Sequence, residues 1–584
     1  MVKPLHQLLV GSALIMATSA FAQSAPEFVW GNLLTGKPGQ DQNSGIAVSG
    51  DNSVYWLSTN GSTTDDTDVT YAGRFLYDGS AYDGTSANRN LTLLKTNAGG
   101  AEQWVVYSKA GDFISGEGKV AVNSNGDIVI FGSVRHTDGY YGNGICLVDA
   151  SGKETELSWE VGEKTNNRLF LATITSDGNI RWAKTFEVST APAAAADGSN
   201  SDFTTNAVNA YALAVDGDNN IYIGGRYRNP LTFNKADGSD VTLKPKNVST
   251  WDGDSQKACG DMYVVKLDSD GNYLTHLEEA GDEVEISYVW DLRYANGSLF
   301  MAAYAKSDGE ASMTVGGVSL TPNQYISPIV GRLNGDLDVE WMHLLPGGDV
   351  AGKNAVQNVS ISVSENNVWL TGAYNGRISD GADETKFVES TQGNLREGFI
   401  IKLDAKDGNW LAAADSRSDF SQNFLTAYLR VITEDETGSD NILVYGYALN
   451  ATVGAFIRTY NAETLSADTD QAWNIVTQGG APTAQDIAYM PDLRAAFVTV
   501  RGNKAFQPLG GELSEGVTGF TNYLARFDLP ESTSGVDSVV DVAPADTEGE
   551  VIYFDLQGRQ VKNPSASGIY VRKQGDKVSK IMVR

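Results

Sequence analysis

Short runs of alternating apolar and polar residues, separated by turns rich in Asp, Gly and Asn, extend along most of this chain of 584 residues. Alternation with a period of two is typical of β-strands that bury one face, and Asp-Gly-Asn turns supply the positive φ angles that tight hairpins need. Two hairpin patterns recur. One joins an Ala-Val strand to a Tyr-Ile-Gly strand, as in 213–224, and the other joins a Lys-Leu-Asp strand to a Trp strand, as in 399–410. The pattern therefore predicts units of four short strands.

The last strand of each unit carries a large aromatic residue that recurs about every 63 to 91 residues. Self-similarity on this scale indicates one supersecondary unit repeated, and units built of short strands favour a propeller over a helical solenoid. Seven copies predict seven blades. The aromatic residues are Trp30, Trp104, Trp182, Tyr273, Trp341, Trp410 and Trp473. We interpret them as packing between adjacent blades, because large aromatic side chains are mostly buried.

The final unit reaches Pro530 without its Trp strand, whereas the first Trp strand stands alone near the N-terminus. We therefore expect Phe28–Leu33 to pair with Tyr523–Phe527, which closes the ring and leaves no open sheet edge. The predicted fold is all-β: a seven-bladed β-propeller over residues 23–530, closed by the N-terminal strand. Several small β-sandwiches in tandem are the alternative, but they do not explain the displaced strand.

The two ends of the chain differ in composition from the repeats. Residues 1–22 combine an early Lys, a short apolar run and an Ala-Phe-Ala sequence, which is the pattern of a secretory signal peptide. Residues 531–549 are polar and acidic, as in a linker, and residues 550–584 contain further strand patterns that predict a small C-terminal β domain. We therefore expect an exported protein that is secreted or held at the outer cell surface.

Two sets of motifs resemble known families. The strings AVDGDNNIYIGG and FIIKLDAKDGNW resemble the β-propeller repeats of secreted bacterial proteins. The stretches YFDLQGR, GIYV and KIMVR, at 553–559, 568–571 and 580–584, resemble the C-terminal sorting domain of type IX secretion cargo in Bacteroidetes. This second resemblance implies that the tail binds the secretion machinery, whereas the first implies a fold and no chemistry.

The charge of the chain limits its partners. The formal net charge is −30, and removal of the signal with its single Lys makes it one unit more negative. Such a field repels phosphate backbones, so we expect no nucleic-acid partner. No apolar run reaches the roughly 20 residues of a membrane span, so we expect no transmembrane segment. Cations, neutral glycans and proteins remain as ligands.

Long connections between the two hairpins of each unit should open on one face of the propeller. Ligand contact is expected there, because long loops on a rigid scaffold usually carry binding function and aromatic faces beside carboxylates suit sugar rings. The same aromatic residues would alternatively pin the loops to the scaffold. One connection, from Phe233 to Leu243, is predicted to form an extra hairpin instead. The candidate ligand-binding residues are Tyr71, Tyr77, Tyr82, Tyr140, Tyr141, Trp159 and Trp251.

Metal and disulfide chemistry have limited support. Asp268 and Asp270 place alternating carboxylates around a Gly turn, a pattern that suits Ca²⁺, but an ordinary hairpin turn gives the same sequence. No other cofactor is expected. Cys146 and Cys259 should lie on the same face of neighbouring blades, which allows either a disulfide or two thiols.

No catalytic motif stands out, since HExxH, GxSxG and a P-loop are all missing from the sequence. The favoured hypothesis is an exported binding or scaffold protein that uses its long-loop face for glycan or protein ligands. A glycan-active propeller enzyme and a structural cell-surface protein are the alternatives.

Overall fold

The computed structural model describes most of residues 25–530 and four strands near the C-terminus. Contacts divide the chain into two units, one of which is Ser24–Pro530, while the other includes the C-terminal strands. The described residues are 25–36, 39–61, 67–79, 89–110, 112–114, 117–135, 144–158, 167–189, 208–246, 250–251, 256–257, 260–280, 286–307, 311–350, 352–353, 355–390, 395–418, 420, 425–450, 452–478, 482–517, 519–530, 551–554, 560–561, 568–574 and 577–583.

The larger unit is nearly all β, and its strands form seven antiparallel sheets with the same order of four strands. The innermost strands are β3 (Gln42–Val48), β10 (Lys119–Val122), β16 (Val208–Val215), β25 (Ile286–Ala295), β32 (Ala355–Val363), β38 (Thr426–Ile432) and β42 (Thr483–Met490). The second strands are β4 (Ser53–Asn60), β11 (Ile128–Arg135), β17 (Ile221–Tyr227), β26 (Ser298–Lys306), β33 (Asn367–Asn375), β39 (Asn441–Ala448) and β43 (Ala495–Gly502).

The third and fourth strands complete each sheet outward. The third strands are β7 (Asn90–Asn97), β14 (Arg168–Ile174), β22 (Asp261–Leu267), β29 (Ser327–Leu333), β36 (Glu397–Asp404), β40 (Gly454–Asn461) and β45 (Gly519–Asp528). The fourth strands are β8 (Glu102–Ala110), β15 (Ile180–Val188), β23 (Tyr273–His276), β30 (Val339–Leu344), β37 (Trp410–Asp415), β41 (Ala467–Gln478) and β1 (Glu27–Thr35).

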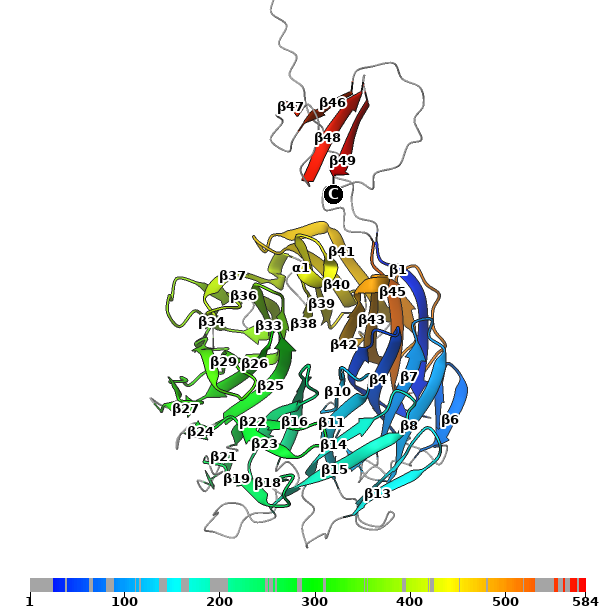
Figure 1. Ribbon diagram of the computed structural model, residues 1–584, viewed down its shortest axis with the longest axis vertical. Helices are drawn as coiled ribbons and strands as arrows, with labels where there is room; N and C mark the ends of the chain where they lie inside the picture. Colours follow the sequence, from blue (N-terminus) through cyan, green and yellow to red (C-terminus); the bar gives the residue numbers. More distant parts are fainter. Residues whose placement is uncertain are drawn as a thin grey trace, which may run out of the picture. The chain divides into compact units, whose positions relative to one another are not determined.

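The sheets stand around a central opening, as Figure 1 shows. Each innermost strand contacts the innermost strand of the next sheet, and β42 contacts β3. Apolar clusters fill the space between neighbouring sheets. This arrangement of radial four-stranded sheets is a β-propeller.

Strand β1 is the fourth strand of the sheet that contains β42, β43 and β45. It pairs antiparallel with β45, with Phe28 opposite Phe527 and Leu33 opposite Tyr523. Beside this pairing, the buried Asp41 accepts hydrogen bonds from the N–H groups of Gly36 at 3.1 Å and Gly61 at 3.2 Å. Burial raises the pKa of Asp41 to about 7 despite these hydrogen bonds. A carboxyl group that is costly to ionise therefore lies where the first and last sheets meet.

The recurring Trp residues pack between neighbouring sheets. The indole Nε1 of Trp182, on β15, donates to the carbonyl oxygen of Ser269 at 3.0 Å, in the turn before β23. The ring covers Gly271 of that turn, where a methyl group would lie 2.7 Å from the indole. The same contact, Trp over the turn Gly of the next sheet, recurs at the pairs Trp30 and Gly100, Trp104 and Gly178, and Trp341 and Gly408. The interpretation of these residues as packing between neighbouring units is confirmed.

The long connections between second and third strands form hairpins that extend the preceding sheet. They are β5 (Asp68–Tyr71) with β6 (Arg74–Asp78) on β1, β12 (Gly144–Val148) with β13 (Glu154–Ser158) on β8, and β18 (Leu231–Asn234) with β19 (Asp240–Leu243) on β15. Two more hairpins pair with short strands that follow a fourth strand: β27 (Met313–Val315) with β28 (Val318–Leu320) on β24 (Glu279–Ala280), and β34 (Arg377–Ser379) with β35 (Phe387–Glu389) on β31 (Gly347–Gly348). The hairpin predicted from Phe233 to Leu243 is therefore one of five.

The remaining elements are short. They are β2 (Gly39–Gln40), β9 (Asp112–Phe113), β20 (Thr250–Trp251), β21 (Gln256–Lys257), β44 (Phe506–Pro508), α1 (Glu434–Thr437), η1 (Ser416–Ser418) and η2 (Pro491–Leu493). The second unit contains one sheet in the order β47–β46–β48–β49, formed by β46 (Val551–Phe554), β47 (Gln560–Val561), β48 (Gly568–Gln574) and β49 (Lys577–Val583).

Candidate ligand site

Tyr71 and Tyr77 are buried, with 1% and 3% of their surface exposed. The Tyr71 hydroxyl donates to the carbonyl oxygen of Gly100 at 2.9 Å and accepts from Asn32 at 2.8 Å. The ring of Tyr77 stacks on Tyr107 with 4.1 Å between the ring centroids. Both side chains therefore hold the β5–β6 hairpin on the scaffold and are not exposed to a ligand, so their assignment to the ligand-binding surface is corrected. The cause is the extra hairpin, which turns a predicted surface loop into a packed sheet extension.

Most of the other aromatic candidates lie outside the residues that the structure describes. Tyr82, Tyr140, Tyr141 and Trp159 are outside the described residues, and Trp251 is described only as a backbone position of β20. Their role in binding stays a prediction.

The side chain of Asp268 stabilises the turn that precedes β23. One carboxylate oxygen accepts from the N–H groups of Asp270 and Asn272 at 2.9 and 2.8 Å, and the other accepts from the Asn272 side chain at 3.0 Å. These bonds account for the Asp-x-Asp-Gly-Asn sequence as a hairpin turn. Calcium binding by Asp268 and Asp270 stays a prediction.

Cys146 is a buried free thiol in β12. Its Sγ lies 3.8 Å from a carboxylate oxygen of Glu154, and burial raises its pKa, with Glu154 adding to the effect. Cys259 lies outside the described residues, so the disulfide stays a prediction.

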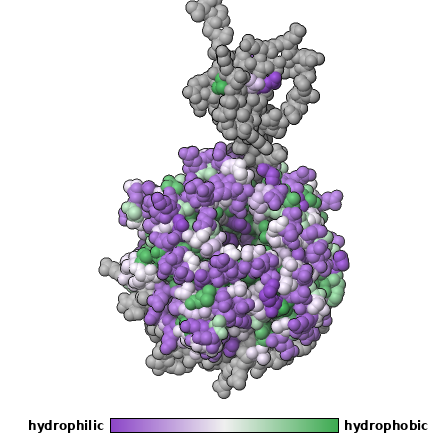
Figure 2. All heavy atoms as spheres, in the orientation of Figure 1, coloured by the Kyte–Doolittle hydropathy of each residue, from purple (hydrophilic) through white to green (hydrophobic). Residues whose placement is uncertain are grey.

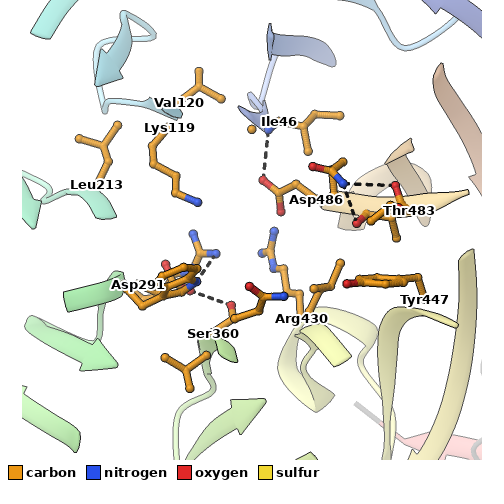
Figure 3. A pocket seen from close by; sticks show the side chains of 18 residues that line it. Ile46, Lys119, Val120, Leu213, Asp291, Ser360, Arg430, Tyr447, Thr483 and Asp486 are labelled. Atoms are coloured by element: carbon orange, nitrogen blue, oxygen red, sulfur yellow. Dashed lines mark hydrogen bonds and ion pairs between the residues drawn. The ribbon is translucent and has the colours of Figure 1, made fainter. Parts of the chain in front are cut away.

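A cavity of about 250 Å³ lies in the central channel of the propeller, and all seven innermost strands contribute to its lining. Figure 3 shows side chains from these strands converging on it. Figure 2 shows a largely hydrophilic face that is hollowed at the centre of the ring. The lining residues are Gly45, Ile46, Lys119, Val120, Leu213, Trp290, Asp291, Arg293, Asn358, Val359, Ser360, Leu429, Arg430, Tyr447, Thr483, Ala484, Gln485 and Asp486.

The cavity spans the middle of the innermost strands, because Ile46, Leu213 and Arg293 lie past the midpoints of β3, β16 and β25, whereas Thr483 begins β42. Gln42, the first residue of β3, pairs with Thr59 near the end of β4, so the connections from second to third strands leave from the end of the ring at which the innermost strands begin. We call it the connection end. Thr483 begins β42 and Tyr447 stands near the end of β39, and both line the cavity. Part of the lining of the channel site therefore reaches the connection end.

Irregular pairing on the innermost strands aims consecutive side chains at the cavity. Six of them shift register against their second strand, and in β25 the shift between Val289 and Asp291 leaves Trp290 without an opposite residue. In a regular strand, neighbouring side chains point to opposite faces, but a bulge breaks this alternation. Trp290 and Asp291 both line the cavity as a result, and so do Gln485 and Asp486 at the shift in β42.

The two lining carboxylates also tie neighbouring sheets together. Asp291 accepts from the backbone N–H of Ile361 at 3.0 Å and from the Ser360 hydroxyl at 2.7 Å, both on the next innermost strand. Asp486 accepts from the N–H of Ile46 at 3.2 Å, across the junction between the last and first sheets. Each carboxylate thus satisfies an N–H group just past a bulge in the next strand, where the regular ladder is interrupted.

Three cationic side chains share the lining. Arg293 donates through Nε to the carbonyl oxygen of Ile361 at 3.2 Å, and its Nη2 lies 3.5 Å from Asp291, which raises the pKa of Arg293 above its ordinary value. Arg430 donates to the carbonyl oxygen of Ile487 and approaches Glu436 at 3.5 Å. Lys119 has no ion pair or hydrogen bond among the residues that the structure describes.

A second cavity, of about 290 Å³, lies beside β22 and is lined by residues that include His276, Lys246 and Glu279. Glu279 is a half-buried residue whose carboxyl pKa is raised well above its ordinary value, first by desolvation and then by the neighbouring Asp261. It accepts from the N–H of Met262 at 2.9 Å and from the Ser287 hydroxyl at 3.0 Å. Two neighbouring carboxyl groups in this environment make it costly to ionise both.

The channel residues Lys119, Asp291, Arg293, Arg430 and Asp486 were not anticipated from the sequence. A signal is present in the repeat, because Asp291, Ser360 and Arg430 occupy equivalent positions about 70 residues apart, and the Asp291–Ser360 bond spans 69 positions. Most charged residues on short strands face solvent, so this spacing alone does not reveal a ring of facing side chains.

No protein-family model and no curated relative matches this sequence. Among solved structures, the chain is similar to quinohemoprotein alcohol dehydrogenase from Comamonas testosteroni, at 10% identity and a TM-score of 0.34, over 88% of this chain and 79% of that one. It is similar to the Dos1 propeller at 8% identity and a TM-score of 0.35, over 84% and 95% of the two chains. It is also similar to Trypanosoma rangeli sialidase in complex with sialic acid at 9% identity and a TM-score of 0.32, over 74% and 56%.

Structural similarity at such low TM-scores supports no conclusion about the fold or the function of this chain. Its fold rests on its own strand pairing, and its function on its own site. Within the described part of the chain, no helix has the length and apolar character needed to cross a membrane.

Proposed function

We propose that this chain is an exported binding protein whose ligand site is the central channel of the propeller. The proposal includes a ring of seven blades closed by β1. It is supported by seven sheets with a common strand order, by the cyclic contacts of their innermost strands and by the pairing of β1 with β45.

Export and sorting belong to the same proposal. The signal pattern of residues 1–22 and the three sorting motifs in the tail support delivery to the outer cell surface, with the secretion machinery as partner of residues 550–584.

The observation that carries the binding function is the cavity whose lining comes from all seven innermost strands. It holds aromatic residues, Trp290 and Tyr447, together with amides and hydroxyls such as Asn358, Gln485 and Thr483. The exposed lining is more polar than apolar, which suits a ligand that carries several hydroxyl groups better than an apolar one. Planar aromatic faces beside polar side chains suit sugars. A glycan is therefore the favoured ligand, and a protein segment that inserts into the channel is the second.

The long connections extend the proposed binding surface. The segments that carry Tyr82, Tyr140 and Trp159 join strands at the connection end, because β11 ends there and β7 and β14 begin there. In the proposed function these residues contact the parts of a ligand that project from the channel.

The test is a glycan and protein binding screen with residues 23–530, followed by a variant that fills the channel. Thr483→Trp adds a large ring to the cavity wall, and Thr232→Trp, on the outer hairpin strand β18, is the matched control. Binding lost in the first variant and kept in the second, at equal thermal stability, supports the site. Full binding by Thr483→Trp places the ligand elsewhere and refutes the channel.

A glycan-active enzyme is the second candidate, and Glu279 is the observation that favours it. A carboxyl group whose pKa is raised is suited to act as a general acid, and Asp261 is a neighbouring second carboxyl group of the kind that glycoside cleavage needs. The assay is release of reducing sugar from the glycans that bind in the screen. Release that disappears in Glu279→Gln would support the enzyme, and no release by the wild-type protein would refute it. A structural cell-surface role is the third reading, and it would be favoured if no ligand binds.

A further inference from the structure

The lining carboxylates of the channel are already engaged by donors from the protein. Both oxygens of Asp291 accept hydrogen bonds, from the N–H of Leu292 on one side and from Ser360 and Ile361 on the other. Asp486 is engaged in the same way by the N–H groups of Ile487 and Ile46, at 2.8 and 3.2 Å. The channel therefore offers a ligand few free anionic acceptors.

The polar groups of the lining that remain free for a ligand include N–H donors on positively charged side chains. Lys119 begins β10 and lines the cavity, and Figure 3 shows its ammonium group pointing toward the middle of the channel. No residue in the described ranges pairs with it. Arg293 uses Nε for the carbonyl oxygen of Ile361 and Nη2 for Asp291, which leaves Nη1 without a partner in the same ranges. Two cations from different sheets thus retain free N–H groups in one cavity.

A half-buried ammonium group without a partner, as at Lys119, is costly, and an anionic ligand removes that cost. A carboxylate fits better than a phosphate, because Asp291 and Asp486 also line the cavity and repel a second negative charge. The volume of about 250 Å³ lies below the range of about 300–1,000 Å³ typical of drug-sized ligands. The occupant is therefore small, and the amides of Asn358 and Gln485 suit its hydroxyl groups.

The geometry points to a carboxylated sugar, such as a uronic acid at the end of a glycan, whose carboxylate is bound by Lys119 and Arg293 in the central channel. This inference rests on the proposed function and names the ligand class of its site.

The experiment compares D-glucuronate with D-glucose, which differ only in the carboxylate at C6. Binding is measured by titration calorimetry on residues 23–530, with inorganic phosphate as a third probe. Lys119→Met keeps the apolar stem and removes the charge, Lys119→Arg keeps the charge, and Lys153→Met in an exposed turn is the matched control.

We expect glucuronate to bind the wild-type protein about tenfold or more tightly than glucose or phosphate. Lys119→Met should weaken glucuronate binding about ten- to hundredfold, in line with loss of a charged hydrogen bond. Lys119→Arg and Lys153→Met should retain it, and thermal unfolding should be unchanged in all three variants.

Equal affinity for glucose and glucuronate, or full glucuronate binding by Lys119→Met, would overturn the inference, and so would the lack of glucuronate binding at tens of millimolar. Phosphate binding as tight as glucuronate would overturn the carboxylate class. The proposed function would survive each of these outcomes as long as Thr483→Trp abolishes binding of a ligand from the screen, so the two failures are distinguishable.

Discussion

Replacing Gly271 by Ala tests the contact between the recurring Trp residues and the turns of the next sheet. Gly271 has φ +73°, and a methyl group there would lie 2.7 Å from Cη2 of Trp182. Gly126 has φ +78° in another hairpin turn, but a methyl group there meets nothing within 4 Å. The two substitutions therefore share a backbone penalty, and only one of them displaces a Trp ring.

The expected costs follow from these contacts. Ala in the left-handed region costs about 1–2 kcal/mol at either position. At Gly271 the Trp182 ring must also move, which gives up its hydrogen bond to Ser269, worth about 0.5–1.5 kcal/mol, and adds about 1–3 kcal/mol of repacking. We expect Gly271→Ala to lower the free energy of unfolding by about 2–4 kcal/mol more than Gly126→Ala does.

The assay is urea unfolding of the full chain, followed by Trp fluorescence and circular dichroism. A Trp182→Ala background provides the second leg of a double-mutant cycle, in which the extra cost of Gly271→Ala should vanish. Equal destabilisation by Gly271→Ala and Gly126→Ala would refute the argument, as would an extra cost that persists without Trp182.

Three further predictions concern the junction of the ring and the tail. Burial raises the pKa of Asp41 from 3.8 to about 7, so the folded protein holds this proton more tightly than the unfolded chain does. The stability that protonation of Asp41 contributes is therefore fully present below pH about 4 and is lost as the pH rises to about 7. Asp41→Asn should remove up to about 4 kcal/mol of this pH dependence, measured by urea unfolding from pH 4 to 8. Trp30→Ala removes the Nε1 bond to Ala98 at 2.9 Å and the packing on Gly100, and should cost about 3 kcal/mol and expose the N-terminal strand to protease. Deleting residues 531–584 should leave the propeller folded, by circular dichroism and thermal unfolding, but misplaced in the cell.

Each of these has a result that would contradict it. A stability curve for Asp41→Asn that keeps the wild-type slope between pH 4 and 7 would show that Asp41 is ionised throughout. Wild-type protease resistance in Trp30→Ala would show that β1 is held without this contact. Unchanged surface display after the deletion would mean that the tail is not a sorting signal.

The strands of each sheet could be predicted because the alternation and the Asp-Gly-Asn turns are local. The pairing of Phe28 to Leu33 with β45 could also be anticipated, from a count of Trp strands. The extra hairpins were recognised only between Phe233 and Leu243. The others carry the same pattern in shorter form, such as Met313–Val315 followed by two Gly residues and Val318–Leu320. Strands of three residues give too little alternation to be read with certainty.

The channel site could not be predicted, because two of its determinants are not local. Bulges aim Trp290 and Asp291 into the same cavity, and nothing in the order of residues marks where a bulge occurs. The ring then brings Lys119, Arg293 and Asp486 together from three sheets. The sequence instead predicted ligand binding by aromatic residues on the long connections. Tyr71 and Tyr77 are buried, so the position of a residue between two predicted strands is a poor guide to its exposure.

The hairpins between second and third strands affect the order in which the fold can be completed during synthesis. Three of them, β5–β6, β12–β13 and β18–β19, extend the sheet before their own, so the edge of that sheet stays open until about half of the next has been made. The first hairpin, β5–β6, joins β1, and β1 must in turn wait for β45, whose residues are the last of the propeller to emerge. A nascent chain of this protein therefore carries β1 without its β45 partner until nearly all of the propeller has been translated.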